Sequence, residues 1–243
     1  MTARSLTVWV TPFTTLSSLE QAIATVRQLS AKAGRGWSPN LLLPTHFGKW
    51  PQRQCRQTLP ADMLVASADD VTWIRGKVEA AGIGFGCWGV PVDQGGAAIA
   101  RDMALAGGYY VANFEPDQFW LPGDDPAAID AWWTEYWDSS YMDPLSGNTA
   151  ATVVPNGWGL GAFKTSLGNL AAGCGALTLE VYGGLQTASS YPSPNLWPLD
   201  GFAEVRAAGV DANLVPILAQ LNLSTQIALA NRLGHGNVHV WAI

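Results

Sequence analysis

Short apolar runs alternate with amphipathic segments along the chain. Eight runs have the length and composition of buried strands, and seven segments between them place apolar residues at helical spacing. The runs are 6–10, 40–43, 83–88, 109–114, 151–154, 177–182, 214–221 and 238–243. This alternation is typical of parallel strands that are joined by helical crossovers.

The predicted helices have start and stop signals of the usual kinds. The first begins at Ser17, with Glu20 three residues later as a capping box, and ends near Gly34. The second follows Asp69 and ends at Gly82. The others are predicted at 97–106, from Asp125 onward, and at 166–172, 202–208 and 224–233.

Eight strands and seven helices in about 250 residues match a (β/α)₈ TIM-type barrel. We therefore predict an α/β fold, with one domain over residues 1–243 and without the last helix of the barrel. A doubly wound sheet is the alternative. It is disfavoured because no predicted strand is followed by GxGxxG at the start of a helix.

Composition narrows the function classes. The chain has 13 basic and 19 acidic side chains, a formal net charge of −6, and Lys and Arg are scattered singly. Nucleic-acid binding is therefore not expected, because phosphate contacts need clustered positive charge. No stretch of about 20 apolar residues is present, so no membrane span is expected either.

The cysteines and histidines predict neither a metal site nor a disulfide framework. Cys55, Cys87 and Cys174 form no CxxC, and the three histidines form no HxH or HExxH. We expect no metal and no cofactor. The first ten residues have no apolar signal-peptide core, so we expect synthesis in the cytoplasm, with release or association with a virion left open.

In a barrel of this kind the active site lies at the carboxyl ends of the strands. Alternation along the fourth strand puts Asn113 and Glu115 on one face, and along the sixth it points Glu180 and Tyr182 inward. Two carboxylates that converge on one mouth can cleave a glycosidic bond. Other candidate binding residues at strand ends are His46, Trp50, Trp88, Asp117, Asn156, Trp158, Gln220 and Trp241.

Structural roles are open for several of these residues. Glu115 could be a solvated loop residue in a turn with Pro116, and Glu180 could be a buried ion-pair partner of Lys49 or Lys164. His239 is expected in the interior or near the opposite end of the barrel, with a structural role. Residues 45–60 and 183–199 are expected to be long loops that shape a cleft.

The segment GYYVANFEPD, residues 108–117, resembles the fourth-strand signature of the family 18 chitinases and family 25 lysozymes. The resemblance implies that Glu115 is the acid, while Asn113 stands where those families have Asp. Tyr182 in LEVYGG resembles the tyrosine that assists the substrate acetamido group. Trp241 in VHVWAI resembles the tryptophan that floors the subsite, whereas the first-strand Asp has no counterpart in residues 6–12.

Two functions follow from these observations. The first is a glycoside hydrolase that acts on a polysaccharide or a peptidoglycan-type glycan. The alternative is a barrel that binds carbohydrate without cleaving it, such as a structural component of a phage tail.

The missing last helix predicts an uncovered seam between the eighth and first strands. Its outward side chains would be Val8, Val10, Val238, Val240 and Ala242. We expect these residues to form an apolar patch, covered by another subunit, by a further domain or by the loops of the N-terminal half.

Overall fold

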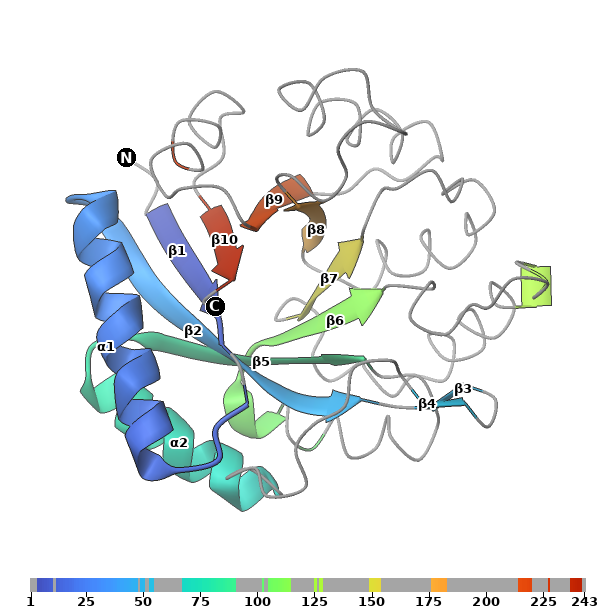
Figure 1. The fold of residues 1–243 in the computed structure, drawn as a ribbon, viewed down its shortest axis with the longest axis horizontal. Helices are drawn as coiled ribbons and strands as arrows, with labels where there is room; N and C mark the ends of the chain where they lie inside the picture. The colour runs from blue at the N-terminus through green and yellow to red at the C-terminus, as the bar shows by residue number, and fades with distance from the viewer. Residues whose placement is uncertain are drawn as a thin grey trace.

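Eight parallel strands form the sheet of this protein (Figure 1). The structure is a computed structural model that describes residues 4–10, 12–47, 49–50, 53–54, 67–90, 102, 105–114, 125, 127–128, 149–153, 176–182, 214–219, 227 and 237–241. The strands are β1 (Arg4–Trp9), β2 (Trp37–Phe47), β5 (Gly84–Val90), β6 (Tyr110–Phe114), β7 (Thr149–Val153), β8 (Ala176–Tyr182), β9 (Leu214–Ala219) and β10 (Asn237–Trp241).

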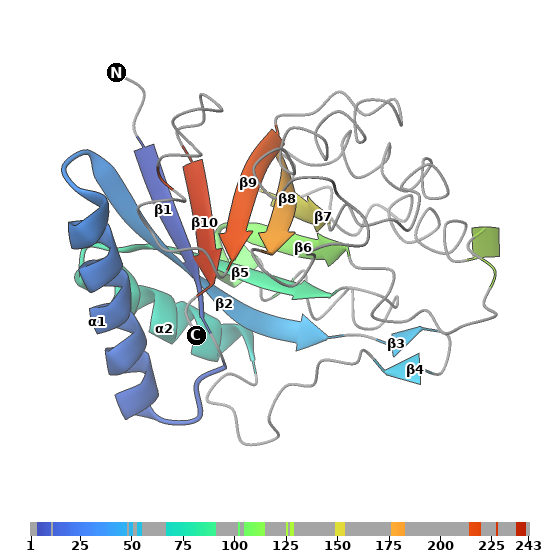
Figure 2. The same cartoon turned by 45° about the horizontal axis from the view of Figure 1, so that its top comes forward.

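The sheet curls until its two edges meet. The strand order is β1-β10-β9-β8-β7-β6-β5-β2, and β1 also pairs with β2, which closes the ring. A separate antiparallel pair, β3 (Lys49–Trp50) and β4 (Arg53–Gln54), lies beyond the end of β2 (Figure 2). All eight predicted strands are confirmed, with ends that differ by a few residues.

The strand register gives the stagger of the barrel. The offset of two paired strands is the difference in residue number between paired residues. Followed from β1 through β2 and around to β10, these offsets add up to 224, whereas β1 pairs directly with β10 at an offset of 232. The difference, 232 − 224, is a stagger of eight residues. A stagger equal to the number of strands is the geometry of TIM-type barrels.

This stagger arranges interior side chains in layers that alternate strands supply. Positions at one height shift by one residue from each strand to the next. Thr7 and Gly86 therefore share one layer, Leu42, Val111 and His239 the next, and Trp9 and Trp88 the one above. The short distance between the Trp9 and Trp88 rings, 5.0 Å between centroids, agrees with this assignment.

Two helices cover the outside of β1, β2 and β5 (Figure 1). They are α1 (Leu16–Ala33) and α2 (Ala68–Ala80). Leu19 and Val26 of α1 and Ile74 of α2 are buried in one cluster with outward residues of the strands. The Arg27 guanidinium donates to the carbonyl of Ala81 at 2.6 and 3.2 Å, which ties α1 to the end of α2.

The predicted starts of these helices were wrong by one to two residues. Thr15, not Ser17, caps α1: its hydroxyl accepts from the Ser18 amide at 3.1 Å, and Ser18 Oγ accepts from the Thr15 amide at 3.1 Å. Ser67 caps α2 with Asp70 in the same reciprocal way, so Asp69 lies inside the first turn. A serine or an aspartate at the third helical position can return the hydrogen bond as glutamate does, so a capping box does not require Glu.

The predicted end of α1 is confirmed, whereas α2 ends at Ala80, two residues before the predicted Gly82. Gly34 caps α1 with φ 95°, a left-handed conformation that glycine adopts without strain. Of the third predicted helix, the described residues show Leu105–Gly107 in helical conformation. The remaining predicted helices fall almost entirely outside the described residues.

The outward side chains of the seam between β10 and β1 are covered. Val8, Val10, Val238 and Val240 do point outward, but each is at most 3% exposed. They pack in the outer cluster with Phe13 and α1, and Ile227 lies against the same cluster. The chain itself therefore covers these four valines, and Ala242 lies outside the described residues. Within the described part of the chain, no helix is long and apolar enough to cross a membrane.

We expect Gly86→Ala and Gly76→Ala to have opposite effects on stability. A Cβ on Gly86 would lie 2.8 Å from the Tyr109 ring, 2.9 Å from Leu42 and 3.0 Å from the Tyr109 carbonyl, so overpacking should cost about 1–3 kcal/mol. A Cβ on Gly76, exposed within α2, meets open space and should stabilise by about 0.5–1 kcal/mol. Urea unfolding of both variants measures the difference. Equal effects would contradict the described interior packing.

Candidate functional site

An aromatic layer crosses the interior of the barrel. Trp9 and Trp88 lie with their ring planes tilted by 52°, and Leu42 and Val111 pack against them. Each of the four side chains is at most 3% exposed. The layer separates the carboxyl ends of the strands, above it, from the amino ends below.

A histidine from the last strand supports this layer from beneath. The indole Nε1 of Trp9 donates to Nδ1 of His239 at 3.2 Å. Burial lowers the pKa of His239 to about 3, so the ring is neutral at physiological pH. Because Nδ1 accepts a hydrogen bond, the proton of the neutral ring is assigned to Nε2.

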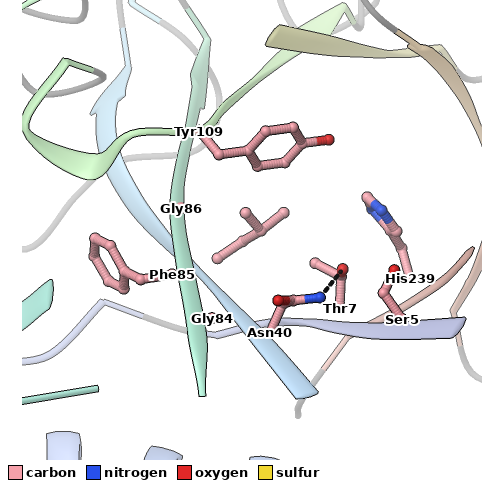
Figure 3. A pocket seen from close by; sticks show the side chains of 9 residues that line it. Ser5, Thr7, Asn40, Gly84, Phe85, Gly86, Tyr109 and His239 are labelled. Atoms are coloured by element: carbon pink, nitrogen blue, oxygen red, sulfur yellow. Dashed lines mark hydrogen bonds between the residues drawn. The ribbon is translucent and has the colours of Figure 1, made fainter. Parts of the chain in front are cut away.

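Below the aromatic layer lies a cavity of about 330 Å³. Its described lining comes from the amino-terminal halves of the strands: Ser5, Thr7, Asn40, Leu42, Gly84, Phe85, Gly86, Tyr109 and His239. Figure 3 shows the side chains of Asn40, Thr7, Ser5, His239 and Tyr109 around this space, with Phe85 on the other side of its strand. Asn40 Nδ2 donates to Thr7 Oγ1 at 3.5 Å.

Sequence reasoning about the active site missed this cavity because it concentrated on strand ends. A signal was nevertheless present in β1, where polar Ser5 and Thr7 alternate with Leu6 and Val8. In a barrel whose outer face is apolar, such alternation places hydroxyl groups inside. The expectation that His239 lies in the interior is confirmed.

The backbone places several predicted site residues at or near the carboxyl ends of strands. Asn113 is next to last in β6 and pairs with Thr152. Glu180 and Tyr182 belong to the last part of β8, where Glu180 pairs with Ile217 and Tyr182 with Ala219, and Trp241 ends β10. Glu115, Asp117, Asn156, Trp158 and Gln220 lie outside the described residues.

The region after the second predicted strand differs from the expectation. Residues 45–46 belong to β2, which continues to Phe47, and Trp50 lies in the short β3–β4 hairpin instead of an irregular loop. The Thr45 hydroxyl donates to the Trp88 carbonyl at 3.2 Å and is buried. Trp88 was expected to bind substrate, and its side chain is part of the buried aromatic layer.

Neither a metal centre nor a reactive thiol is found among the described residues. They contain no group of three His, Cys, Asp or Glu side chains that could hold a metal ion. Cys87 is buried against Gly107, and burial raises the pKa of its thiol. A thiol with a raised pKa is a poor nucleophile, so Cys87 has a packing role.

Comparisons with known proteins support the fold. The C-terminal domain of an assigned chitinase from Desulfitobacterium hafniense DCB-2 is similar with a TM-score of 0.58 and 13% identity, over 89% of this chain and 66% of that one. Phospho-2-dehydro-3-deoxyheptonate aldolase from Francisella tularensis SCHU S4 is similar with a TM-score of 0.51 and 10% identity, over 98% of this chain and 73% of that one. An HpcH/HpaI aldolase from Desulfitobacterium hafniense DCB-2 has a TM-score of 0.50 and 10% identity, over 98% of this chain and 86% of that one.

No family model and no curated protein sequence matches the chain. The structural likenesses, all below 25% identity, show an α/β barrel-type fold with a parallel sheet. Because they include a chitinase domain and aldolases, the fold leaves hydrolysis and aldol chemistry equally open.

The buried neutral His239 should make stability depend on pH. Its pKa of about 3 lies below the unfolded value of about 6.5, so the unfolded state takes up a proton first as pH falls. This group should therefore cost roughly 2 kcal/mol of stability between pH 7 and pH 5. The free energy of unfolding in urea, measured at both pH values, gives the slope.

The matched variant is His239→Gln, whose amide oxygen can accept from Trp9 but does not titrate. We expect this variant to be less stable at pH 7 and to lose less stability between pH 7 and pH 5 than the wild type. The same loss in both proteins would show that His239 is not the titrating group.

Proposed function

We propose that the barrel binds a glycan at the carboxyl ends of its strands and hydrolyses a glycosidic bond there. Glu115 is the general acid, and Glu180 is the second carboxylate. Asn113 and Tyr182 orient the reacting sugar. The remaining contacts come from His46, Trp50, Asp117, Asn156, Trp158, Gln220 and Trp241.

The strand register is the observation that supports this site most directly. Glu180 pairs with Ile217, Ile217 pairs with His239, and the His239 side chain is inside the barrel. Paired positions of parallel strands share a face of the sheet, so we assign Glu180 to the interior. Asn113, two residues after the interior Val111, is assigned to the same face.

The stagger also gives these positions a common height. Starting from Leu42 and advancing one residue per strand, the layer above the Trp9–Trp88 pair contains Pro44, Asn113, Glu180 and Trp241. This topmost layer would combine a carboxylate, an amide and an indole over an aromatic floor. Aromatic rings offer the apolar faces of pyranoses a flat surface, and the carboxylate is the group that glycosidic cleavage needs.

The interior positions favour hydrolysis over Schiff-base aldol chemistry. A Schiff base needs a lysine amine at the reacting centre. None of the eight barrel strands contains a lysine in its described residues; Lys32 and Lys77 are on helices and Lys49 is in β3. The acidic and aromatic residues at strand ends fit a glycosidase better.

In the proposed reaction, Glu115 protonates the glycosidic oxygen as the bond to the anomeric carbon breaks. Glu180 either attacks that carbon or activates a water molecule, and the separation of the two carboxyl groups decides between these routes. We further propose that the chain completes a (β/α)₈ arrangement in which α1 and α2 are the first two of seven helices.

Replacing either carboxylate should abolish turnover. We expect Glu115→Gln and Glu180→Gln to lower kcat on chitin oligosaccharides or peptidoglycan fragments by at least about 100-fold, because general acid–base groups contribute about 10²–10⁴-fold. Glu20→Gln, at an exposed position of α1, is the matched control. Reducing-sugar release measures turnover, and full activity of both site variants would contradict the assignment.

A second candidate function is glycan binding without cleavage. It is favoured by Asn113, an amide that can donate and accept hydrogen bonds but cannot supply charge. The same assay separates the two functions. Saturable glycan binding without turnover, in the wild type and in Glu115→Gln alike, identifies a binding module.

Trp50 provides a test of the glycan surface that does not depend on turnover. Trp50→Ala should weaken glycan binding several-fold and leave the Tm nearly unchanged, because aromatic contacts are worth about 0.5–1.5 kcal/mol and β3 lies outside the barrel. Trp73→Ala, a 45% exposed position of α2, is the control for loss of a surface indole. A large fall in Tm for Trp50→Ala would place the ring in a core.

A further inference from the structure

Three polar side chains at the cavity below the aromatic layer have hydrogen-bonding capacity left over. Nδ1 of His239 is taken by Trp9, and the described contacts give Nε2 no partner. Thr7 and Asn40 share one long contact of 3.5 Å, which leaves the Thr7 hydroxyl proton and the Asn40 amide oxygen available. Thr7 and His239 are each only 5% exposed, so their polar atoms are accessible chiefly from within the cavity.

Buried polar groups of this kind are costly unless something pairs with them. Figure 3 shows that the imidazole of His239, the hydroxyl of Thr7 and the amide of Asn40 face one space, with the Tyr109 ring on another side of it. Together they present donors and acceptors to the interior of one cavity. The unused hydrogen-bonding capacity therefore points to an occupant.

Two glycines keep the wall beside these groups free of side chains. A Cβ on Gly84 would overlap Asn40 Oδ1, and a Cβ on Gly86 would lie against Leu42 and Tyr109. A larger residue would displace Asn40 at the first position and Leu42 or Tyr109 at the second. The volume of about 330 Å³ is at the small end of the range of ligand pockets.

The described lining combines polar and apolar groups, and none of them is charged. Ser5, Thr7, Asn40 and Tyr109 carry no charge at neutral pH, and burial keeps His239 neutral. A charged ligand would be desolvated there without a counter-charge, and an apolar one would leave the polar groups unpaired. Hydroxyl groups, which both donate and accept, fit this lining best.

We propose that the amino-terminal half of the barrel is a second binding site, for a small uncharged polyhydroxylated molecule of polyol or monosaccharide size. The site is separate from the proposed glycan site, because the Trp9–Trp88 layer lies between them. His239 Nε2 donates to a ligand hydroxyl, and Asn40 Oδ1 accepts from one. The proposal does not depend on the barrel being a hydrolase.

Calorimetric titration of the full chain with xylitol and glucose tests this site. We expect saturable binding of at least one of them at or below about 10 mM, where polyols do not yet stabilise proteins through general exclusion. Gluconate, which is charged, and benzene, which is apolar, should not bind in the cavity. Binding of benzene in preference to both neutral probes would overturn the proposal.

Thr7→Val keeps the shape of the side chain and removes its hydroxyl. We expect it to weaken xylitol or glucose binding about five- to tenfold, as the loss of one buried hydrogen bond does. Thr72→Val is the matched control, because Thr72 is exposed on α2 and bonds only its own helix, at the Ala68 carbonyl. Asn40→Ala is a second variant at the cavity, and it should weaken xylitol or glucose binding as well. It replaces Thr7→Val in the test if Thr7→Val does not fold.

The mouth of the barrel is the other place where a sugar could bind, and Glu180→Gln distinguishes it. If the two cavity variants bind normally while Glu180→Gln does not, the polyol occupies the carboxyl-terminal mouth and the second site is refuted. Absence of saturable binding by both neutral probes refutes it as well, and the cavity then holds water only. Neither result bears on glycosidic turnover, which is measured separately.

Discussion

The pairing of β1 with strands on both of its sides is the constraint on which the rest of the structure depends. It joins residues near the beginning of the chain to β10, more than 200 positions later, and leaves no free edge in the ring. Because the ring closes with a stagger of eight, side chains from alternate strands must share each interior layer. The contacts of Trp9 with Trp88 and His239 follow from this geometry.

The hydrogen bond between Trp9 and His239 divides the interior into two environments. Above it, the indole rings of Trp9 and Trp88 pack with Leu42 and Val111 in a buried layer. Below it the described lining includes small and polar residues, and Gly84 and Gly86 let Asn40, Leu42 and Tyr109 pack closely against β5. A neutral histidine suits the boundary, because one ring nitrogen can serve the layer above while the other faces the polar side.

The strands could be predicted from the sequence because each is a short apolar run between turn residues, and burial on both faces enforces that composition. The first residues of the helices were harder to predict, since Thr15 and Ser18 form a capping box as effectively as a Ser-x-x-Glu pattern would. What covers the seam could not be predicted, for a different reason. The outward direction of Val8 and Val240 follows from alternation, but what covers them depends on packing between distant segments, which no local pattern encodes.

For the candidate site, the sequence predicts which residues lie near strand ends, and the strand register adds their relative positions along the barrel axis. Asn113 and Glu180 are far apart in the chain, yet counting residues around the staggered ring puts their backbone positions at one height. The lower cavity required coordinates, because an unused nitrogen on His239 becomes apparent only when its Trp9 partner is known. His239 is hydrogen-bonded to Trp9, and Trp9 belongs to the floor of the proposed mouth. If a ligand on His239 changes the affinity of the mouth through Trp9, linkage requires that a ligand at the mouth change the affinity of the cavity by the same factor.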